Sequence, residues 1–187
     1  MLSAPRPATR EEVPILDLTP LNESKPLGAL AKELRRACET LERLGEKGFL
    51  STRAGLLAHA LCAQGRYEEA GPFIEVAVEA GSEDDQSTQA LWRSARAKVV
   101  AQKGDVDEAL RLAKEAVAIV APTDWLNTRG DALLDLAEVL ELAERPDEAA
   151  PVLAEALHLY QQKGNIVAAE KAEQLLAQLR EETPSTP

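Results

Sequence analysis

The feature that most constrains the fold is a short segment that occurs three times at nearly even spacing. It reads GRYEEA at 65–70, GDVDEA at 104–109 and ERPDEA at 144–149, so the copies lie 39 and 40 residues apart. A repeat with a period of about 20 to 50 residues indicates that one small structural unit is used several times. Neighbouring units of this kind stack and bury a common core.

Alanines recur around each copy at fixed distances. When the three segments are aligned on their last residue, an alanine also stands seven residues after it and twelve residues before it. Two closely packed helices leave room for a methyl group but for little more. Each segment is therefore predicted to be the turn of a helical hairpin, where the first helix ends and acidic residues begin the second. The three columns are Ala58, Ala97 and Ala137; Ala70, Ala109 and Ala149; and Ala77, Ala116 and Ala156.

Apolar residues spaced three or four apart predict an all-α chain of about eight helices, arranged as a right-handed α-solenoid. A composition of 45% hydrophobic but only 3% aromatic residues also favours packed helices over sheets. Pro72 and Pro151 fall inside two helices, which should begin late or bend there. The last helix should cap the array, with Lys171, Gln174 and Gln178 exposed. The predicted helices cover about 27–45, 51–64, 67–80, 86–103, 106–121, 124–143, 147–162 and 165–180.

The chain is expected to have three parts. Residues 27–180 form the repeat domain, and residues 181–187 form a disordered tail. Residues 1–26 are rich in proline and form an extended arm or tail that contains VPILDLTPL at 13–21. The apolar residues of this segment favour an arm that docks on its own or a neighbouring solenoid, and the alternative is a disordered tail.

The repeat pattern resembles the tetratricopeptide repeat (TPR), with its small residue on helix A, its G-x-Y-x-E-A turn and its alanine on helix B. GRYEEA is the fullest match, while periods of 39 and 40 residues exceed the usual 34 of that family. Residues 33–177 also resemble the C-terminal repeats of bacterial signalling proteins that carry a nucleotide cyclase and a STAND-type ATPase domain. The chain has neither a P-loop nor cyclase aspartates, so the resemblance implies a scaffold without either activity.

The net charge of −11 argues against nucleic-acid binding and against anionic membrane surfaces. No apolar run is long enough for a transmembrane helix, and no signal peptide is evident at the first residues. Cys38 and Cys62 fit neither a disulfide framework nor a zinc site, and they lie at periodic positions where small core residues are expected. A cytoplasmic location follows as the expectation.

No motif for catalysis, nucleotide binding or metal binding occurs in the chain. We therefore expect no enzyme activity, no cofactor and no metal. His59 is placed on the groove side of its helix, where a partly exposed polar residue is the ordinary interpretation and a contact with a ligand is the alternative. His158 near a helix end favours the C-terminal dipole.

The segment LWRSARAK at 91–98 carries the only unusual charges. Arg96 aligns with the core leucines Leu57 and Leu136, and a buried arginine is costly unless it is paired. Asp131 and Asp135 on a later helix could pair with it. The two alternatives are a salt-bridge network between repeats and a cationic site for a peptide carboxylate. The candidate groove residues are His59, Arg93, Arg96, Lys98, Asp131, Asp135 and Glu138.

The tryptophans Trp92 and Trp125 lie near the starts of two helices and are expected to pack between repeats rather than to form a binding platform. The predicted function is a non-catalytic scaffold that binds a protein or peptide, as a regulatory or assembly module in bacterial signalling. The alternative is a structural oligomerisation module, in which the N-terminal arm joins copies of the chain.

Overall fold

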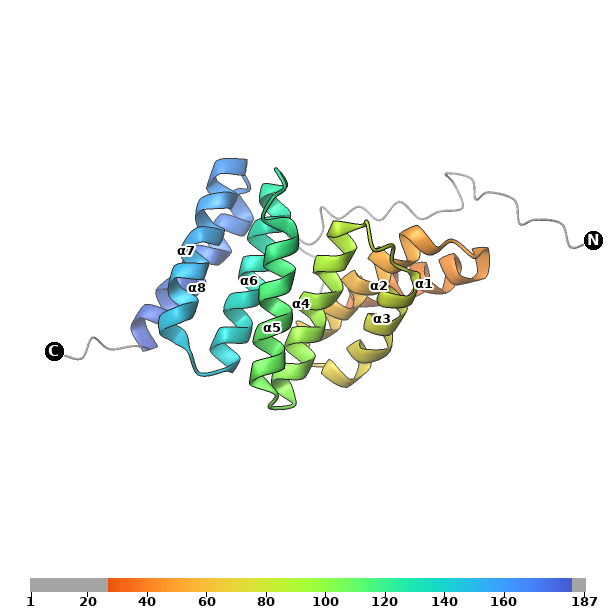
Figure 1. The fold of residues 1–187 in the computed structure, drawn as a ribbon, viewed down its shortest axis with the longest axis horizontal. Coiled ribbons are helices and arrows are strands. Elements are labelled where there is room, and N and C mark those ends of the chain that lie inside the picture. Colours follow the sequence, from red (N-terminus) through yellow and green to blue (C-terminus); the bar gives the residue numbers. More distant parts are fainter. Residues whose placement is uncertain (1–26, 183–187) are drawn as a thin grey trace, which may run out of the picture. The chain divides into compact units, whose positions relative to one another are not determined.

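The computed structural model describes residues 27–182, and these contain eight helices and no strand (Figure 1). This confirms the predicted all-α fold. The described chain divides into two compact units, residues 27–88 and 89–182, which are treated in turn. The arm at 1–26 and residues 183–187 of the expected tail lie outside the described residues.

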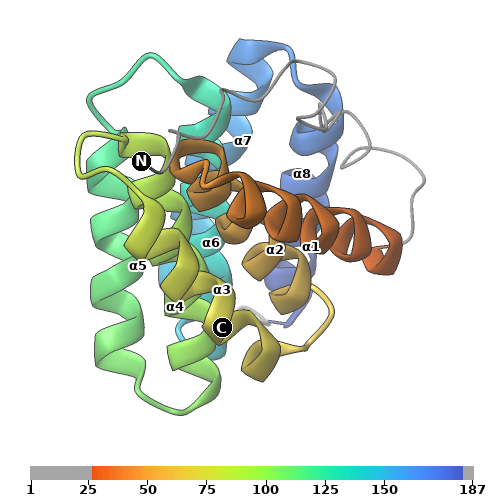
Figure 2. The same ribbon diagram turned by 90° about the vertical axis from the view of Figure 1, so that its right-hand side faces the viewer.

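The first unit contains α1 (Leu27–Leu44), α2 (Lys47–Cys62), α3 (Tyr67–Ala80) and the first residues of α4 (Gln86–Gln102). α1 packs on α2, and α2 packs on α3 (Figure 2). The core forms because the apolar faces of the three helices meet, and its largest side chains are at most 1% exposed. They are Leu34, Leu41, Leu57, Leu61 and Ile74.

Both cysteines of the chain lie in this first unit, and both are buried and free, as the sequence predicted for small core residues. Burial raises the pKa of the Cys38 thiol to about 11, and the nearby negative charge of Glu42 adds to the rise. The thiolate, which is the reactive form, is therefore scarce at neutral pH.

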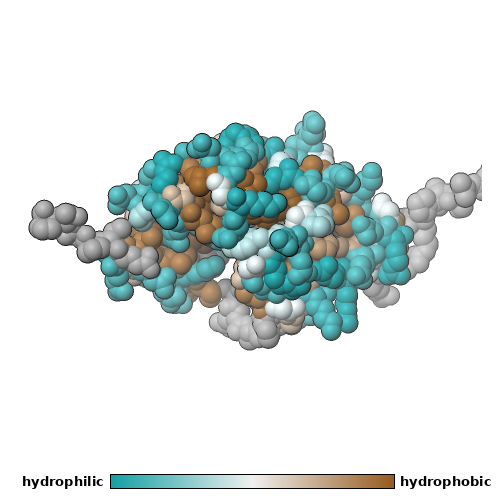
Figure 3. All heavy atoms as spheres, turned by 90° about the horizontal axis from the view of Figure 1, so that it is seen from below, coloured by the Kyte–Doolittle hydropathy of each residue, from teal (hydrophilic) through white to brown (hydrophobic). Residues whose placement is uncertain are grey.

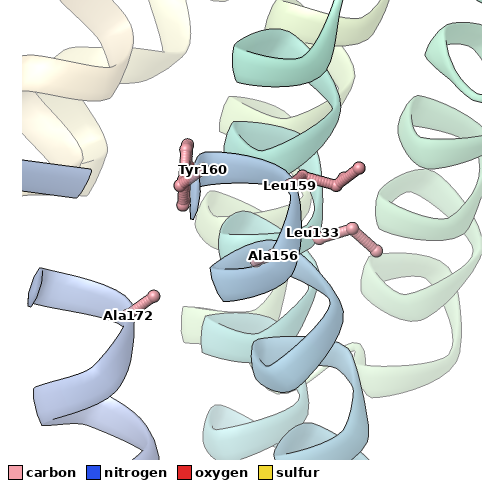
Figure 4. Close-up of a cluster of buried hydrophobic side chains, with 5 residues drawn as sticks. All are labelled: Leu133, Ala156, Leu159, Tyr160 and Ala172. Carbon is pink, nitrogen blue, oxygen red and sulfur yellow. The ribbon is translucent and has the colours of Figure 1, made fainter. Parts of the chain in front are cut away.

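The second unit contains the rest of α4, then α5 (Val106–Val120), α6 (Leu126–Leu142), α7 (Pro146–Lys163) and α8 (Ile166–Glu182). α5 packs on α6, α6 on α7, and α7 on α8. A buried cluster joins α6, α7 and α8, and it includes Tyr160, which is fully buried (Figure 4). Its buried members are Leu133, Ala156, Leu159, Tyr160 and Ala172.

All nine alanines of the repeat columns are at most 1% exposed. The side chains that the sequence aligned are thus the ones at which the paired helices approach each other. A larger side chain at any of these positions would have no space in a close-packed interior.

The turns between hairpin helices share one backbone geometry. Gly65 and Gly104 have positive φ angles of 71° and 87°, and Glu144 adopts the same left-handed conformation with φ 57°. In each turn the next residue donates its N–H to the carbonyl five residues earlier; Arg145, for example, donates to Leu140 over 2.9 Å. These bonds cap the exposed carbonyls at the end of a helix. The third turn therefore keeps the geometry although it lacks the glycine.

Helix boundaries agree with the sequence to within one residue except at both ends of α2, which ends at Cys62 rather than 64, at the start of α6 and at the end of α8. α2 begins at Lys47 rather than 51, because the Glu46 side chain accepts a hydrogen bond from Phe49 N over 2.7 Å and caps the helix there. α6 begins at Leu126 rather than 124. α8 continues to Glu182, two residues past the expected end of the repeat domain, and its Lys171, Gln174 and Gln178 are exposed as expected.

The helices were expected to begin late or to bend at Pro72 and Pro151, and the first of these alternatives is wrong. α3 begins at Tyr67 and α7 at Pro146, five residues before the respective prolines, and both helices continue through them. Both prolines are exposed, so the carbonyl that loses its partner in the preceding turn can accept a hydrogen bond from water.

Figure 3 shows the surface of the chain coloured by hydropathy. Hydrophilic side chains cover most of the visible face, and hydrophobic side chains emerge between them. Among the described residues the large apolar side chains that remain exposed are few and spread along the chain: Leu27, Phe49, Trp125, Leu142 and Ile166.

Candidate functional site

The candidate site is built on three side chains of α4, those of Trp92, Arg93 and Arg96. The indole of Trp92 is largely buried, and the guanidinium carbons of Arg93 and Arg96 lie 4.1 Å and 4.9 Å from its ring centroid. Cations at this distance are attracted by the electron-rich ring face. Both arginines are half buried, although Arg96 aligns with the core leucines Leu57 and Leu136. The guanidinium of Arg96 lies against the ring of Trp92, whereas the leucines aligned with Arg96 carry no charge to accommodate.

Gln89, one turn earlier on α4, orients this group. Its side-chain oxygen accepts hydrogen bonds from the Trp92 indole over 3.2 Å and from Arg93 Nη1 over 2.7 Å. Arg93 Nη1 also donates to the Gln89 carbonyl over 2.9 Å. From α5, Glu115 approaches Arg93 Nε to 3.5 Å. The Arg93 side chain is thus fixed from three directions, which lowers the entropic cost of using it in binding.

A depression of about 360 Å³ opens beside Arg93 and Glu115, and Ala118 and Ile119 of α5 form its apolar part. Ala118 is exposed and Ile119 is half buried. Glu115 is held at the same time by Arg111, which also pairs with Glu108 over 2.6 Å. The site therefore combines an arginine, a carboxylate and an aliphatic surface.

A second polar group links α4 to α6. The ammonium of Lys98, a residue that is 7% exposed, lies 2.7 Å from Asp135 Oδ1 and 2.6 Å from Glu138 Oε2. Burial opposes the charged ammonium, yet the two carboxylates outweigh it and raise the pKa of Lys98 above its ordinary value. A salt-bridge network thus joins α4 to α6, and its buried cation is Lys98.

Asp131 belongs to the contact between α6 and α7. Its carboxylate accepts a hydrogen bond from the Tyr160 hydroxyl over 2.6 Å, and within residues 27–182 it forms no ion pair. Asp131 is exposed as a residue, yet the atoms packed around its carboxylate raise its pKa to about 6; the hydrogen bond from Tyr160 opposes this rise and the charge of Asp135 adds to it. Burial and the adjacent Asp131 carboxylate likewise raise the pKa of Tyr160.

The predicted site residues make three kinds of contact. Arg93 and Arg96 lie over Trp92, Lys98 pairs with Asp135 and Glu138, and Asp131 accepts a hydrogen bond from Tyr160. His59 is half buried on α2 in the first unit.

Sequence reasoning missed Gln89, Glu115 and Tyr160. Gln89 stands one helical turn before Arg93, and that spacing was a usable signal. Glu115 and Tyr160 approach their partners from other helices, and no local pattern indicated them. Of the two tryptophans, Trp92 packs as expected, whereas Trp125 at the start of α6 is 44% exposed.

Two features are absent from the part of the chain that the structure describes. No three His, Cys, Asp or Glu side chains come together there in a way that could hold a metal ion. None of the helices within 27–182 has the length and apolarity to cross a membrane.

A family profile described as soluble NSF attachment protein, SNAP, matches residues 58–185. Among solved structures, BtubC (BKLC) from P. vanneervenii is similar with a TM-score of 0.62 and 18% identity, over 85% of this chain and 67% of that one. A putative kinesin light chain with TPR-like repeats from Podosopora anserina matches 83% of this chain and 93% of its own, with 19% identity and a TM-score of 0.47. A search of curated proteins found no match.

Proposed function

The chain belongs to the soluble NSF attachment protein family, and on that premise we propose that it is a non-catalytic scaffold that binds a segment of another protein. Its fold is a TPR-like helical repeat array, a class of scaffold that generally mediates protein–protein interactions. The family's name describes attachment to NSF, which supports a role in assembly. The kind of partner is inferred from the residues of the candidate site.

One observation carries the proposal. Arg93 and Arg96 are held over Trp92 beside a depression with an aliphatic surface. Arginine and tryptophan are the residue types that contribute most at protein interfaces, and fixed side chains lose little entropy on binding. The ammonium of Lys98 is buried between Asp135 and Glu138, and Asp131 accepts a hydrogen bond from Tyr160, so both groups hold neighbouring helices together. We therefore assign the partner site to Arg93, Arg96 and the α5 surface next to them.

A photo-crosslinking amino acid at Ile119 tests this assignment in cells. We expect it to capture a discrete protein, and we expect Arg93→Gln to reduce the yield. The matched control carries the crosslinker at Gln174, on the exposed face of α8. Equal capture at both positions, or none at Ile119, would contradict the assignment.

The biological setting is a separate part of the proposal. The resemblance to cyclase and STAND-type ATPase proteins supports a regulatory or assembly module in bacterial signalling, and two reduced, buried cysteines fit a cytoplasmic location. Cell fractionation tests the location, and co-purification of partners with a tagged chain tests the role. Recovery from a secreted fraction would contradict the location, and a partner set without signalling proteins would contradict the role.

Oligomerisation through the N-terminal arm is the second candidate function. It is supported by the apolar segment VPILDLTPL at 13–21, which no repeat accounts for. Sedimentation of the full chain and of a chain without residues 1–24 measures the mass of each. A loss of mass beyond the deleted residues is expected if the arm joins copies, and equal subunit numbers would refute the idea.

A further inference from the structure

We infer that the depression beside Arg93 binds an acidic segment of the partner, with a carboxylate on the Arg93 guanidinium and a neighbouring aliphatic side chain against Ala118 and Ile119. This inference rests on the proposed function and names the chemistry of its partner.

Arg93 has an unused hydrogen-bond donor on a fixed side chain. Nη1 donates twice to Gln89, and Nε faces Glu115 at 3.5 Å, which is longer than a good hydrogen bond. Within residues 27–182, Nη2 of Arg93 has no partner. The edge formed by Nε and Nη2 matches the two oxygens of a carboxylate.

An incoming carboxylate would displace little. Glu115 keeps its contact with Arg111 when it gives up its long contact with Arg93 Nε. The guanidinium itself stays in place, because Trp92 and Gln89 hold it from the other side. The site is therefore organised before the ligand arrives, and a carboxylate gains the charged hydrogen bond at small cost.

The local charge favours an acidic ligand although the chain as a whole is acidic. Arg93 lines the depression with Glu115, and the guanidinium of Arg96 lies over the same Trp92 ring as that of Arg93, so a second cation is close to the site. At physiological salt, charges beyond about 8 Å are largely screened, so the net charge of −11 opposes binding only weakly at contact distance. A basic segment would instead meet two like charges.

The apolar part of the depression selects the residue next to the carboxylate. Ala118 and Ile119 present aliphatic surface directly beside Arg93. An aliphatic side chain would bury this surface, whereas a polar one would be desolvated without a partner. The fitting sequence is therefore one in which aspartate or glutamate stands next to leucine, isoleucine or valine.

Fluorescence polarisation with the full chain tests the inference. The probe is a labelled octapeptide with two Asp-Leu pairs, and the comparison peptides carry Asn for Asp or Ser for Leu. We expect each comparison peptide to bind at least about tenfold more weakly than the probe.

Arg93→Gln should weaken binding of the Asp peptide about tenfold and should leave binding of the Asn peptide almost unchanged. Arg93→Lys should give an intermediate loss, since lysine keeps the charge but lacks the planar fork. Arg180→Gln, at an exposed arginine of α8 that does not line the depression, is the matched control and should change the affinity less than twofold.

Equal binding of Asp and Asn peptides by the wild-type chain and by Arg93→Gln would overturn the inference. The segment ILDL at 15–18 of this chain has the same chemistry as the probe. If Asp17→Asn tightens probe binding, the chain's own segment occupies the depression and the assignment to a separate partner is overturned. Crosslinks at Ile119 that persist in Arg93→Gln would leave the scaffold function standing while this inference fails. Selective binding of the probe without any cellular crosslink would refute the scaffold function instead.

Discussion

Glu144 occupies a position whose backbone favours glycine, and replacing it should stabilise the protein. Its φ of 57° lies in the left-handed region, where the corresponding turns have Gly65 and Gly104. A left-handed conformation costs a residue with a Cβ atom about 1–2 kcal/mol. Glycine avoids this cost but loses roughly 0.5–1 kcal/mol through the greater freedom of the unfolded chain. Glu144→Gly should therefore raise the free energy of unfolding by about 0.5–1 kcal/mol.

Urea denaturation followed by far-UV circular dichroism measures the change, and the melting temperature should rise by roughly 2–4 °C for each kcal/mol. Glu144→Ala is the control, because alanine removes the same exposed carboxylate and keeps the Cβ atom. It should change the free energy of unfolding by less than about 0.5 kcal/mol. The reciprocal variant Gly104→Ala should cost about 1–2 kcal/mol, since its φ is 87° and an added Cβ would meet no neighbour. Equal gains from Glu144→Gly and Glu144→Ala would refute the backbone argument and assign the effect to the side chain.

Three further predictions concern the packing and the charges. Gly130→Ala should lower the free energy of unfolding by about 1–3 kcal/mol, because the new Cβ would lie 2.7 Å from the buried Tyr160 ring. Gly71→Ala, which has open space around it, should raise the free energy of unfolding by about 0.5–1 kcal/mol. Chemical denaturation compares the two variants. Lys98→Met should cost about 3 kcal/mol in the same assay, since two carboxylates lose their shared cation, and an unchanged stability would mean that water replaces the ammonium at no cost. Carbon-detected NMR should show Asp131 titrating near pH 6, and Tyr160→Phe should raise that pKa further because the hydrogen bond favours the carboxylate; a lower value in the variant would exclude this role. Because the folded pKa of Asp131 lies above its ordinary value of 3.8, its contribution to stability should fall as the pH rises from about 4 to about 6.

The repeat made most of the fold predictable. Ala70, Ala109 and Ala149 could be recognised as buried contacts because three copies of the same unit place the same demand on the same position. The helix boundaries followed from glycines and acidic residues at the turns, and α2 differed because a glutamate side chain caps it at Glu46. The spacing of residues along the chain was sufficient to predict the structure wherever the deciding contact lay within one hairpin.

The candidate site was less predictable, since it depends on how helices are rotated against one another. Arg96 and Lys98 are two residues apart, and the sequence alignment placed the first in a core column. In the structure Lys98 is the buried cation, while Arg96 lies half buried over Trp92. Residues two apart on a helix point in nearly opposite directions, so these two cations meet different neighbours. The partners of Lys98 lie on α6, and local spacing in α4 could not show them. The contact from Tyr160 to Asp131 joins residues on different helices, so local spacing could not reveal it.

The distribution of cysteine and tryptophan gives each compact unit its own natural reporter. Cys38 and Cys62 lie buried in the first unit, and Trp92 and Trp125 lie in the second. Because burial holds back the thiols, their rate of reaction with a disulfide reagent measures how often the first unit opens, while indole fluorescence follows the second. The unmodified protein therefore permits a direct measurement of cooperativity between its halves. Coincident transitions would mean that the two units unfold as one, and separate transitions would mean that a partner can remodel one half while the other stays intact.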